Sequence, residues 1–188
     1  TIVSQIGEGP TSEYAALYHR ANDILGALGN LASEMIASQG WKAKCIPPTA
    51  KVSAAELSTP LPHKTTATRA GLGWIGKCAL LVTERYGSAV RLASVLTDME
   101  LPIGDPIERS KCQSCNSCVT SCPAGAPSGK EWDVSFKRED FFNVELCYSE
   151  TSKNAQRPEI GATICGICIA ACPWTKRYLG SKNIKSGR

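Results

Sequence analysis

The sequence predicts an α+β fold, with an α/β core at residues 1–105 and a smaller lobe at residues 106–180. The first half predicts the core, because a long helical pattern of apolar residues is followed there by short apolar runs typical of strands. The second half predicts the lobe, because it holds two groups of cysteines at spacings typical of metal ligands. A chain of 188 residues has room for both parts. Residues 181–188 are expected to form a basic tail.

Residues 11–39 are predicted to form one long amphipathic helix. Apolar residues recur through this stretch at helical spacing, Thr11 or Ser12 is available as the N-cap, and Gly40 is a stop signal. Two glycines interrupt the pattern and permit a bend or a close contact with another part of the backbone.

Short elements are predicted to follow the long helix. Residues 41–46 are a strand candidate ended by two prolines, and residues 63–69 are expected to form a helical turn. Residues 79–83 form a short apolar run and residues 89–97 alternate loosely, so a hairpin or a pair of adjacent strands is expected. Residues 101–106 contain two prolines and a glycine and are interpreted as the linker into the lobe.

The two cysteine groups predict iron–sulfur clusters. The first group is Cys112, Cys115, Cys118 and Cys122, and the second is Cys147, Cys165, Cys168 and Cys172. The first has the spacing C-x2-C-x2-C-x3-C-P of bacterial two-cluster ferredoxins, in which the fourth cysteine of a run ligates the other cluster. By this logic one [4Fe-4S] cluster is held by Cys112, Cys115, Cys118 and Cys172, and a second by Cys122, Cys147, Cys165 and Cys168. The lobe is therefore expected to be ferredoxin-like and to transfer electrons.

Zinc and disulfides are the alternatives for a chain with ten cysteines. Four-cysteine sites built from C-x2-C pairs are common for zinc, but the C-x2-C-x2-C-x3-C-P run is much less typical of it. No charged and apolar leader opens the sequence, so a reduced, cytoplasmic protein is predicted rather than a secreted disulfide framework. Cys45 and Cys78 lie outside both groups, and each is interpreted as a small buried hydrophobic residue.

Charge and hydropathy argue against two classes of partner, nucleic acids and membranes. The formal net charge is +4, and two clusters of about −2 each, counted with their thiolates, would bring it to about zero. The excess of basic residues therefore does not indicate a nucleic-acid surface. No apolar run approaches the roughly 18 residues that span a bilayer, so no membrane partner is expected.

Residues 71–76 read Gly-Leu-Gly-Trp-Ile-Gly and match the G-x-G-x-x-G pattern. The strand, helix and later acidic residue that a dinucleotide site requires around this pattern are missing. Glycines let a backbone approach a planar ligand closely, and Lys77 is placed to meet an anionic group. A tight turn with Trp74 and Ile75 in the core is the other interpretation.

The segment from Arg69 to Trp174 resembles the epoxyqueuosine reductase family in the order and spacing of its motifs. The motifs are Arg69-Ala70-Gly71-Leu72-Gly73-Trp74-Ile75-Gly76-Lys77, both cysteine runs, Glu145-Leu146-Cys147 and Arg157-Pro158-Glu159-Ile160-Gly161. The resemblance implies two [4Fe-4S] clusters on a ferredoxin-like domain, a core that binds cobalamin, and reduction of an epoxide in a modified tRNA base. The fold is also similar to the catalytic unit of reductive dehalogenases. The resemblance further implies that the corrinoid is bordered by Gly71, Gly73, Trp74, Gly76 and Lys77.

Three departures from the family pattern are present. The family's aspartate proton donor upstream of A-G-L-G-W has no counterpart, because this chain has no aspartate between Asp23 and Asp98. Glu56 lies near the place expected for this aspartate, although Leu57 matches that position equally well. The family's asparagine after Gly-Lys is Cys78 here. The upstream region of full-length relatives is short or missing, so the chain is interpreted as a divergent or truncated member.

These patterns support two main functional hypotheses. The first is a corrinoid-linked reductase, in which Glu56, Tyr86 or His63 supplies a proton. The second is an electron-transfer protein that has no chemistry of its own and serves a separate corrinoid or other redox partner protein. Both require a low-potential electron donor. A nucleic-acid-modifying enzyme is a third hypothesis, and tRNA is expected as a partner only if the chain is a true epoxyqueuosine reductase.

Overall fold

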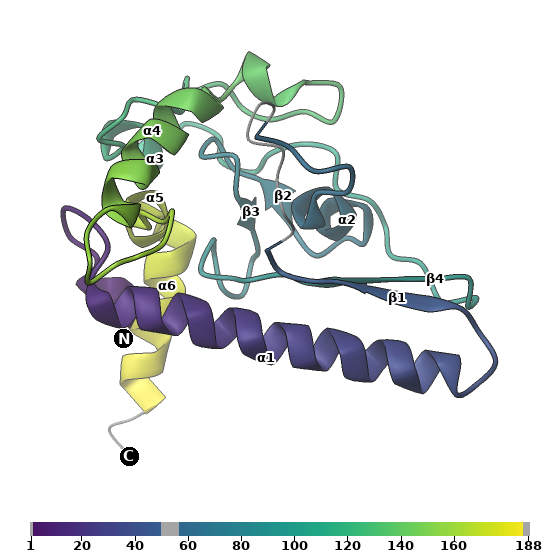
Figure 1. Ribbon diagram of the computed structural model, residues 1–188. Helices are drawn as coiled ribbons and strands as arrows, with labels where there is room; N and C mark the ends of the chain where they lie inside the picture. Colours follow the sequence, from purple (N-terminus) through teal and green to yellow (C-terminus); the bar gives the residue numbers. More distant parts are fainter. Residues whose placement is uncertain (1, 50–56, 186–188) are drawn as a thin grey trace.

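The computed structural model describes residues 2–49 and 57–185. Its helices are α1 (Ser12–Ala37), α2 (His63–Arg69), α3 (Ser117–Thr120), α4 (Val144–Ala155), α5 (Ile167–Ala171) and α6 (Pro173–Lys185), with 3-10 turns η1 (Ile2–Gln5) and η2 (Arg138–Asp140). Its strands are β1 (Ala43–Ile46), β2 (Trp74–Ile75), β3 (Leu81–Val82) and β4 (Ser94–Thr97). Helices with a few short strands confirm the predicted α+β class (Figure 1). In the described part of the chain, no helix is long and apolar enough to cross a membrane.

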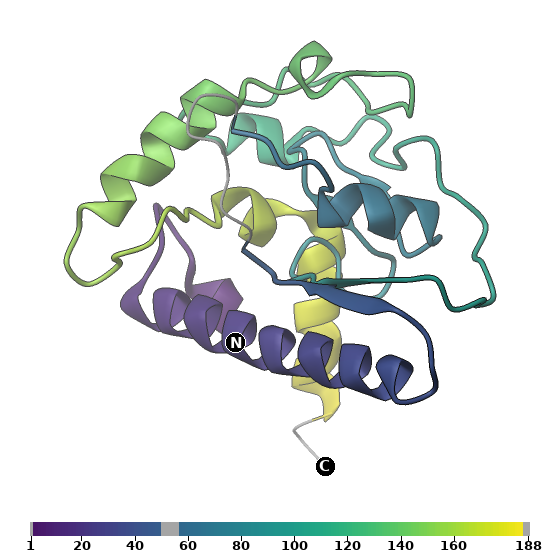
Figure 2. The same cartoon turned by 45° about the vertical axis from the view of Figure 1, so that its right-hand side comes forward.

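The long helix predicted over residues 11–39 is confirmed as α1. Thr11 is its N-cap, because the Thr11 hydroxyl oxygen accepts a hydrogen bond from the Tyr14 backbone N–H at 3.1 Å. Gly40 follows the helix end with a φ of +90°, a conformation that glycine adopts without strain. α1 runs along β1 and β4 at one edge of the molecule (Figures 1 and 2).

The surface of α1 has a close contact and an exposed apolar stripe. Gly29 is buried, and the sulfur of Cys45 on β1 comes so near that a methyl group at Gly29 would overlap it. A helical glycine does permit a close approach here, but the neighbour is a side chain and not the backbone that was expected, and Cys45 is partly buried. Elsewhere on the helix, four apolar side chains at helical spacing are each more than half exposed: Ile24, Leu28, Leu31 and Met35.

The strands form two antiparallel pairs, β1 with β4 and β2 with β3. The hairpin predicted between residues 79–83 and 89–97 is therefore wrong. The chain reverses directly after β2, where the Gly76 N–H donates to the Leu80 carbonyl at 2.9 Å. β3 therefore forms an antiparallel pair with β2, the strand that precedes it. β4 is then free to pair with the more distant β1, and α1 packs on both of these strands.

The main hydrophobic core is built from both predicted parts of the chain. Its buried members are Trp74, Ile75, Ala79, Val82, Ala126, Trp132, Phe141, Phe142 and Cys172. The β2 and β3 residues and the cysteine-rich lobe therefore bury one another's apolar surface, which is the main favourable term in folding. The division of the chain at residue 105 stays a prediction.

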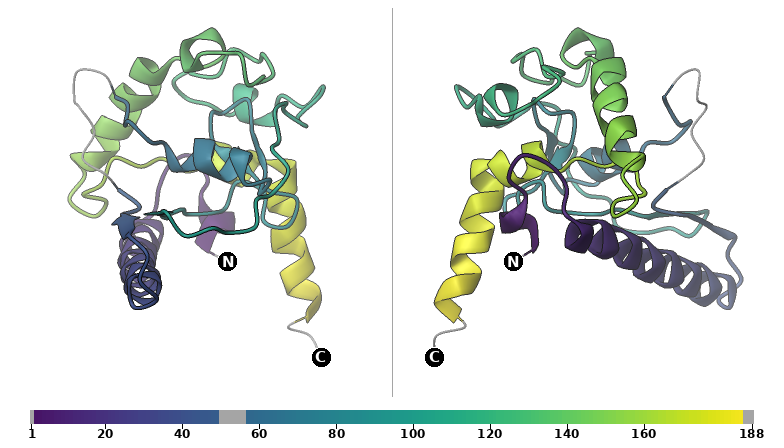
Figure 3. Two further views of the ribbon diagram at one scale, coloured as in Figure 1. Left: turned by 90° about the vertical axis from the view of Figure 1, so that its right-hand side faces the viewer. Right: turned by 60° about the vertical axis from the view of Figure 1, so that its left-hand side comes forward.

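The helix α6 is tied to the chain after β3 through Thr175, which is fully buried. The Thr175 hydroxyl oxygen accepts a hydrogen bond from the Ser88 backbone N–H at 3.1 Å. Gly87 has a φ of +61°, and a methyl group there would lie 2.6 Å from the Thr175 Cα. This contact holds the start of α6 against the core, while the rest of the helix extends beside η1 (Figure 3).

We expect alanine at Gly29 and at Gly26 to have different effects on stability. Both changes favour the helix by about 1 kcal/mol, but only the methyl group at Gly29 meets the Cys45 sulfur, whereas nothing lies within 4 Å at Gly26. Gly26→Ala should raise the Tm of the anaerobic protein by about 2–4 °C. The free energy of unfolding of Gly29→Ala should be lower than that of Gly26→Ala by about 1 kcal/mol or more. Equal shifts for the two variants would contradict the close contact.

Candidate metal centre

The first cysteine group lies on a tight loop and on the short helix α3. The Cys115 N–H donates to the Cys112 carbonyl at 3.0 Å, which closes a turn with Gln113 at a φ of +49°. Cys118 lies on α3, and Cys122 follows the end of that helix. A short stretch of chain thus carries three cysteines, the number that one run supplies to one cluster.

The second cysteine group is spread over two helices. Cys147 lies in the first part of α4, whose start is capped by the side chain of Asn143. Cys165 comes shortly before α5, Cys168 lies on α5, and Cys172 is the C-cap of α5. The proline that follows Cys172 begins α6, as its fixed φ and missing N–H allow at the first position of a helix.

The packing of α3 against α5 brings the two groups together. Burial raises the pKa of the Cys147 thiol to about 11, and the neighbouring thiols of Cys122 and Cys165 add to this effect. Burial also raises the pKa of Cys165, with a further contribution from Cys122. Cys122 of the first group therefore lies among members of the second, as in the ligand exchange expected from the sequence. The ligand sets of the two clusters stay predictions.

The core beside the first group contains an unpaired hydrogen-bond donor. Cys172 is buried in the main core and Cys112 packs against it. Trp74 belongs to the same core, and its indole nitrogen is buried with no hydrogen-bond partner among residues 2–49 and 57–185. A buried donor without a partner costs about 1–3 kcal/mol. Sulfur atoms of a cluster at this place would be acceptors for the indole N–H, so the residues fit such a cluster.

Two side chains from the first half of the chain approach the second group. The Lys64 amine donates to the Ala79 carbonyl at 2.8 Å. Burial, with a smaller effect of Arg138, lowers the pKa of Lys64, while Lys64 in turn lowers that of the Cys147 thiol. From α1, Tyr14 is partly buried, and this burial raises its pKa to about 12, with a smaller contribution from Cys168. The effect of Lys64 on the pKa of this thiol indicates that the amine lies near the predicted second cluster.

The glycine-rich segment packs into the protein and supports the first cysteine loop. Trp74 is fully buried and meets Trp174 edge to face, with ring centroids 5.1 Å apart. The buried Lys77 amine donates to the Gln113 carbonyl at 2.8 Å and to Asn116 Oδ1 at 3.0 Å. The tight-turn interpretation of this segment is therefore confirmed.

Close packing against other parts of the chain also accounts for the glycines of this segment. A methyl group at Gly71 would lie 2.7 Å from the Asp105 carbonyl oxygen, and one at Gly73 would overlap the Val82 carbonyl. A methyl group at Gly76 would lie 2.8 Å from a methyl carbon of Val82. This segment lines neither of the two cavities between described residues that are characterised below. Contact of the segment with a corrinoid stays a prediction.

A cavity of about 1210 Å³ lies between α1 and α4 and has a predicted cluster ligand in its wall. The lining residues are Tyr18, His19, Asn22, Asp23, Gly26, Ala27, Asn30, Pro47, Pro48, Thr49, Leu57, Val144, Cys147, Tyr148, Thr151, Gly161, Ala162 and Thr163. Cys147 connects this cavity to the second cysteine group. Small-molecule sites are commonly of about 300–1,000 Å³, so the cavity is large enough for a large cofactor.

Tyr18 lines the cavity together with Cys147, and its pKa is also shifted, but downwards. Burial acts to raise its pKa, but the hydrogen bond with Thr49 and the charge of Arg91 prevail and lower it. The Arg91 guanidinium lies 4.5 Å from the centre of the Tyr18 ring and also bonds Asn22 and Thr49. Arg91 therefore holds together one side of the cavity.

The predicted proton donors are not gathered at this cavity. The His63 ring nitrogens pair with Ser94 Oγ at 2.8 Å and the Pro47 carbonyl at 2.9 Å. Tyr86 meets Tyr178 edge to face, with ring centroids 5.2 Å apart. Neither His63 nor Tyr86 lines the cavity. Glu56 lies outside the described residues, and the next residue, Leu57, lines the cavity.

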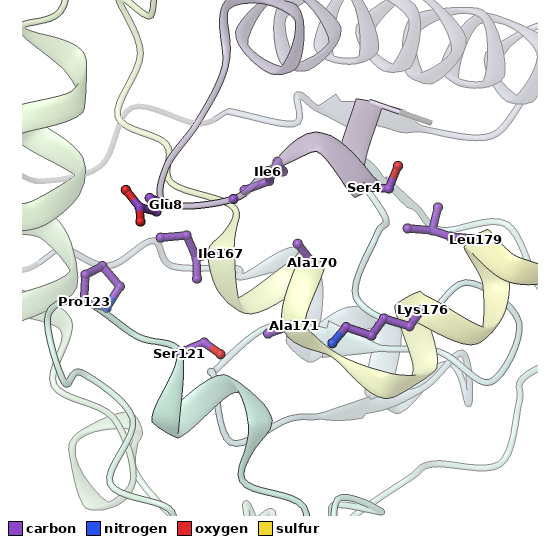
Figure 4. Close-up of a pocket in the computed structure, with 11 residues that line it drawn as sticks. Ser4, Ile6, Glu8, Ser121, Pro123, Ile167, Ala170, Ala171, Lys176 and Leu179 are labelled. Carbon is purple, nitrogen blue, oxygen red and sulfur yellow. The ribbon is translucent and has the colours of Figure 1, made fainter.

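A smaller cavity of about 620 Å³ lies where the N-terminal segment meets α5 and α6. Figure 4 shows Ile167, Ala170 and Ala171 of α5 between Ile6 on one side and Ser121 on the other. Its lining contains no cysteine. Among the described residues, no group of three or more histidine, cysteine, aspartate and glutamate side chains is placed to hold a single metal ion.

Comparison with known proteins relates these features to a family. The family of 4Fe-4S binding domains matches residues 106–128, which contain the first cysteine group. An epoxyqueuosine reductase of Synechococcus sp. (strain CC9605) is 34% identical over 170 residues, which are 88% of this chain and 49% of the relative. That of Escherichia coli (strain K12) is 34% identical over 122 residues, 63% of this chain and 31% of the relative. The chain is a relative of the epoxyqueuosine reductases.

Solved structures of epoxyqueuosine reductases agree with this kinship. One, with an epoxyqueuosine-modified tRNA-Tyr stem loop, superposes with a TM-score of 0.59 at 26% identity and covers 82% of this chain and 39% of its own. A catabolic reductive dehalogenase in complex with 3-bromo-4-hydroxybenzoic acid superposes with a TM-score of 0.68 at 18% identity. The superposition covers 93% of the present chain and 24% of the dehalogenase, and at this identity it shows a similar fold alone. The present chain spans about half or less of the length of the epoxyqueuosine reductases that it matches.

The sequence alone did not identify two residues of the candidate site, Tyr18 and Cys78. In the sequence, Tyr18 is one of the apolar residues that recur at helical spacing in residues 11–39, and no local signal distinguishes it from the others. Cys78 is buried, as expected, but its side chain also hydrogen-bonds with those of Cys118 and Cys168. Its position directly after Lys77 in the glycine-rich segment was the available signal.

We expect Lys77→Met to weaken the first cysteine loop. The change leaves two oxygen acceptors, on Gln113 and Asn116, without their charged donor, at a cost of about 2 kcal/mol. Iron loss to a chelator through local opening should therefore become about thirtyfold faster. The control is Lys111→Met, which removes an exposed pair with Glu84 and should change the rate less than about fivefold. Similar rates for both variants would contradict a supporting role of Lys77.

Proposed function

We propose that this chain is the cluster-bearing part of a corrinoid-linked reductase, in which two [4Fe-4S] clusters deliver electrons to the cavity between α1 and α4. The observation that carries the proposal is the position of Cys147, a predicted ligand of the second cluster and a wall residue of the cavity. An electron that reaches this cluster is therefore beside the space where a cofactor or substrate would bind. The names of the relatives, reductases in each case, support the reaction class.

The cluster ligands in this proposal are those expected from the sequence. Cys122 lies near Cys147 and Cys165, which supports the exchange of one ligand between the two runs. The unpaired indole N–H of Trp74 supports a cluster beside Cys172. The partner that loads the clusters is a low-potential electron donor. The cytoplasm is the compartment proposed for the protein, since thiols there stay reduced.

The residues that line the cavity fit a corrinoid. Proline, leucine and valine side chains supply apolar surface for the flat macrocycle, and Asn22, Asn30 and Thr151 offer partners for its amide side chains. A bound corrinoid would supply cobalt, which takes up electrons singly and becomes a strong nucleophile when reduced. Tyr18 is the proton source proposed from the cavity, and Glu56 stays a candidate from the sequence. A tRNA substrate is left out of the proposal, because the family's upstream aspartate has no counterpart here.

Reconstitution of the full chain with iron and sulfide under anaerobic conditions tests the proposal. We expect eight irons per chain and a broad absorbance at about 400 nm from thiolate-to-iron charge transfer. The reconstituted protein should then retain a corrinoid supplied at micromolar concentration, and the chain should pass electrons to it one at a time. A zinc-containing, colourless protein would overturn the redox function.

Cavity occupation is tested by Gly26→Phe. Gly26 lines the cavity, and no atom lies within 4 Å of the place that a Cβ would take there, so phenylalanine can fill the cavity without displacing the core. Corrinoid retention should fall at least about tenfold, or about 1.4 kcal/mol. The control is Gly180→Phe, at a helical glycine that also has free space around it but lies away from the cavity. Equal retention by both variants would place any bound corrinoid elsewhere.

Arg91 is expected to set the acidity of Tyr18. Arg91→Met removes the positive charge that stabilises the phenolate, so the pKa of Tyr18 should rise. The difference between titrations with and without Tyr18→Phe isolates the tyrosinate absorbance of this residue. Arg85→Met is the matched control, since the Arg85 guanidinium lies over Tyr86 instead. An unchanged Tyr18 titration in Arg91→Met would remove the basis for its role as proton source.

The second candidate function is an electron-transfer protein without chemistry of its own. The exposed apolar side chains of α1 favour it, because a corrinoid-binding partner enzyme would cover them next to the cavity. This function predicts that both clusters assemble while the chain alone retains no corrinoid. The reconstitution described above therefore separates the two candidates.

A further inference from the structure

The turn between β2 and β3 directs Cys78 into the protein. The Ala79 N–H donates to the Gly76 carbonyl at 2.8 Å, and Ala79 adopts a φ of +57°. A non-glycine residue in this conformation is uncommon and needs support from its surroundings. Ala79 is itself part of the buried core, and Cys78 is only 5% exposed. The position of the Cys78 thiol is therefore fixed by the fold.

The Cys78 thiol lies where the two cysteine groups meet. Its side chain hydrogen-bonds with Cys118 of the first group and with Cys168 of the second. A methyl group at Gly76 would lie 3.6 Å from the Cys78 sulfur and 3.7 Å from the Cys112 sulfur. Because α3 carries Cys118 and α5 carries Cys168, this thiol touches the contact between both ligand-bearing helices.

A ninth thiol at this junction has a different task from the other eight. Four thiolates satisfy the four irons of a cluster, so two clusters use both groups completely. Thiolates that bind iron have lost their protons and can only accept hydrogen bonds, whereas a thiol that is not a ligand keeps a donor. Hydrogen bonds to cluster sulfur atoms are among the factors that set the reduction potential. A donor stabilises the reduced cluster more, since reduction adds negative charge.

We propose that Cys78 is not a ligand but a hydrogen-bond donor to a ligand thiolate at the junction of the two clusters, and that it raises the reduction potential of the cluster it faces. The inference rests on the proposed two-cluster function. It makes Cys78 a positioning residue, since it acts through Cys118 or Cys168 and not on a substrate.

The test compares Cys78→Ala with Cys78→Ser in the full, reconstituted chain. Both variants should keep the iron content of the unmodified protein. Redox titrations followed by electron paramagnetic resonance should show one midpoint potential lowered in Cys78→Ala. The ratio of reduced to oxidised cluster at fixed potential should fall about tenfold, which is about 59 mV for a one-electron couple. Cys78→Ser keeps a donor, so its potentials should equal or exceed those of the unmodified protein.

Cys45→Ala is the control, because Cys45 lies on β1 against α1 and outside both cysteine groups. It should leave both potentials unchanged. Unchanged potentials in Cys78→Ala with full iron content would overturn the inference, and so would loss of iron from Cys78→Ser. If Cys78→Ala fails to assemble, a Cys78→Ser potential below that of the unmodified protein overturns it. Failure of the unmodified chain to bind iron would instead refute the proposed function.

Discussion

The burial of the turn between β2 and β3 is the constraint on which the rest of the structure depends. Gly73 lets this turn approach the Val82 carbonyl, and Trp74 fills the space in the core that the cysteine-rich segments surround. Lys77 extends from the same turn into the first cysteine loop. The core and the predicted metal centre are therefore parts of one packed unit, in which a change of volume is felt at the ligands.

Two lysines, Lys77 buried and Lys64 partly buried, complement this packing. Lys64 and Lys77 both reach the cysteine region from the first half of the chain, and each amine is held by a backbone carbonyl. Clusters with thiolate ligands are anionic, and ions in a protein interior are costly unless opposite charge and hydrogen bonds compensate them. The lysines therefore suit a centre that gains further negative charge on reduction. The same region borders the larger cavity through Cys147.

Local patterns predicted much of the fold, and long-range pairings were not predictable. The cap at Thr11, the stop at Gly40 and the apolar period fully determine α1, because each signal acts within a few residues. The pairing of β1 with β4 depends on α1 packing over both strands, which no local pattern contains. The cysteine spacing indicated clusters from residue types alone, whereas the contacts of Cys78 and the cavity position of Tyr18 arise only from the tertiary structure.

The hydrogen bond between Ser88 and Thr175 also has a consequence for biosynthesis. It joins the middle of the chain to the start of α6, and Cys172 reaches the core on the same stretch. A nascent chain still lacking Thr175 cannot close this core, although its first cysteine group has already left the ribosome. The cysteines of that group are then exposed thiols on an incompletely folded chain. Iron insertion consequently belongs after Thr175 has left the ribosome, and a carrier that protects these thiols until then would have a clear task.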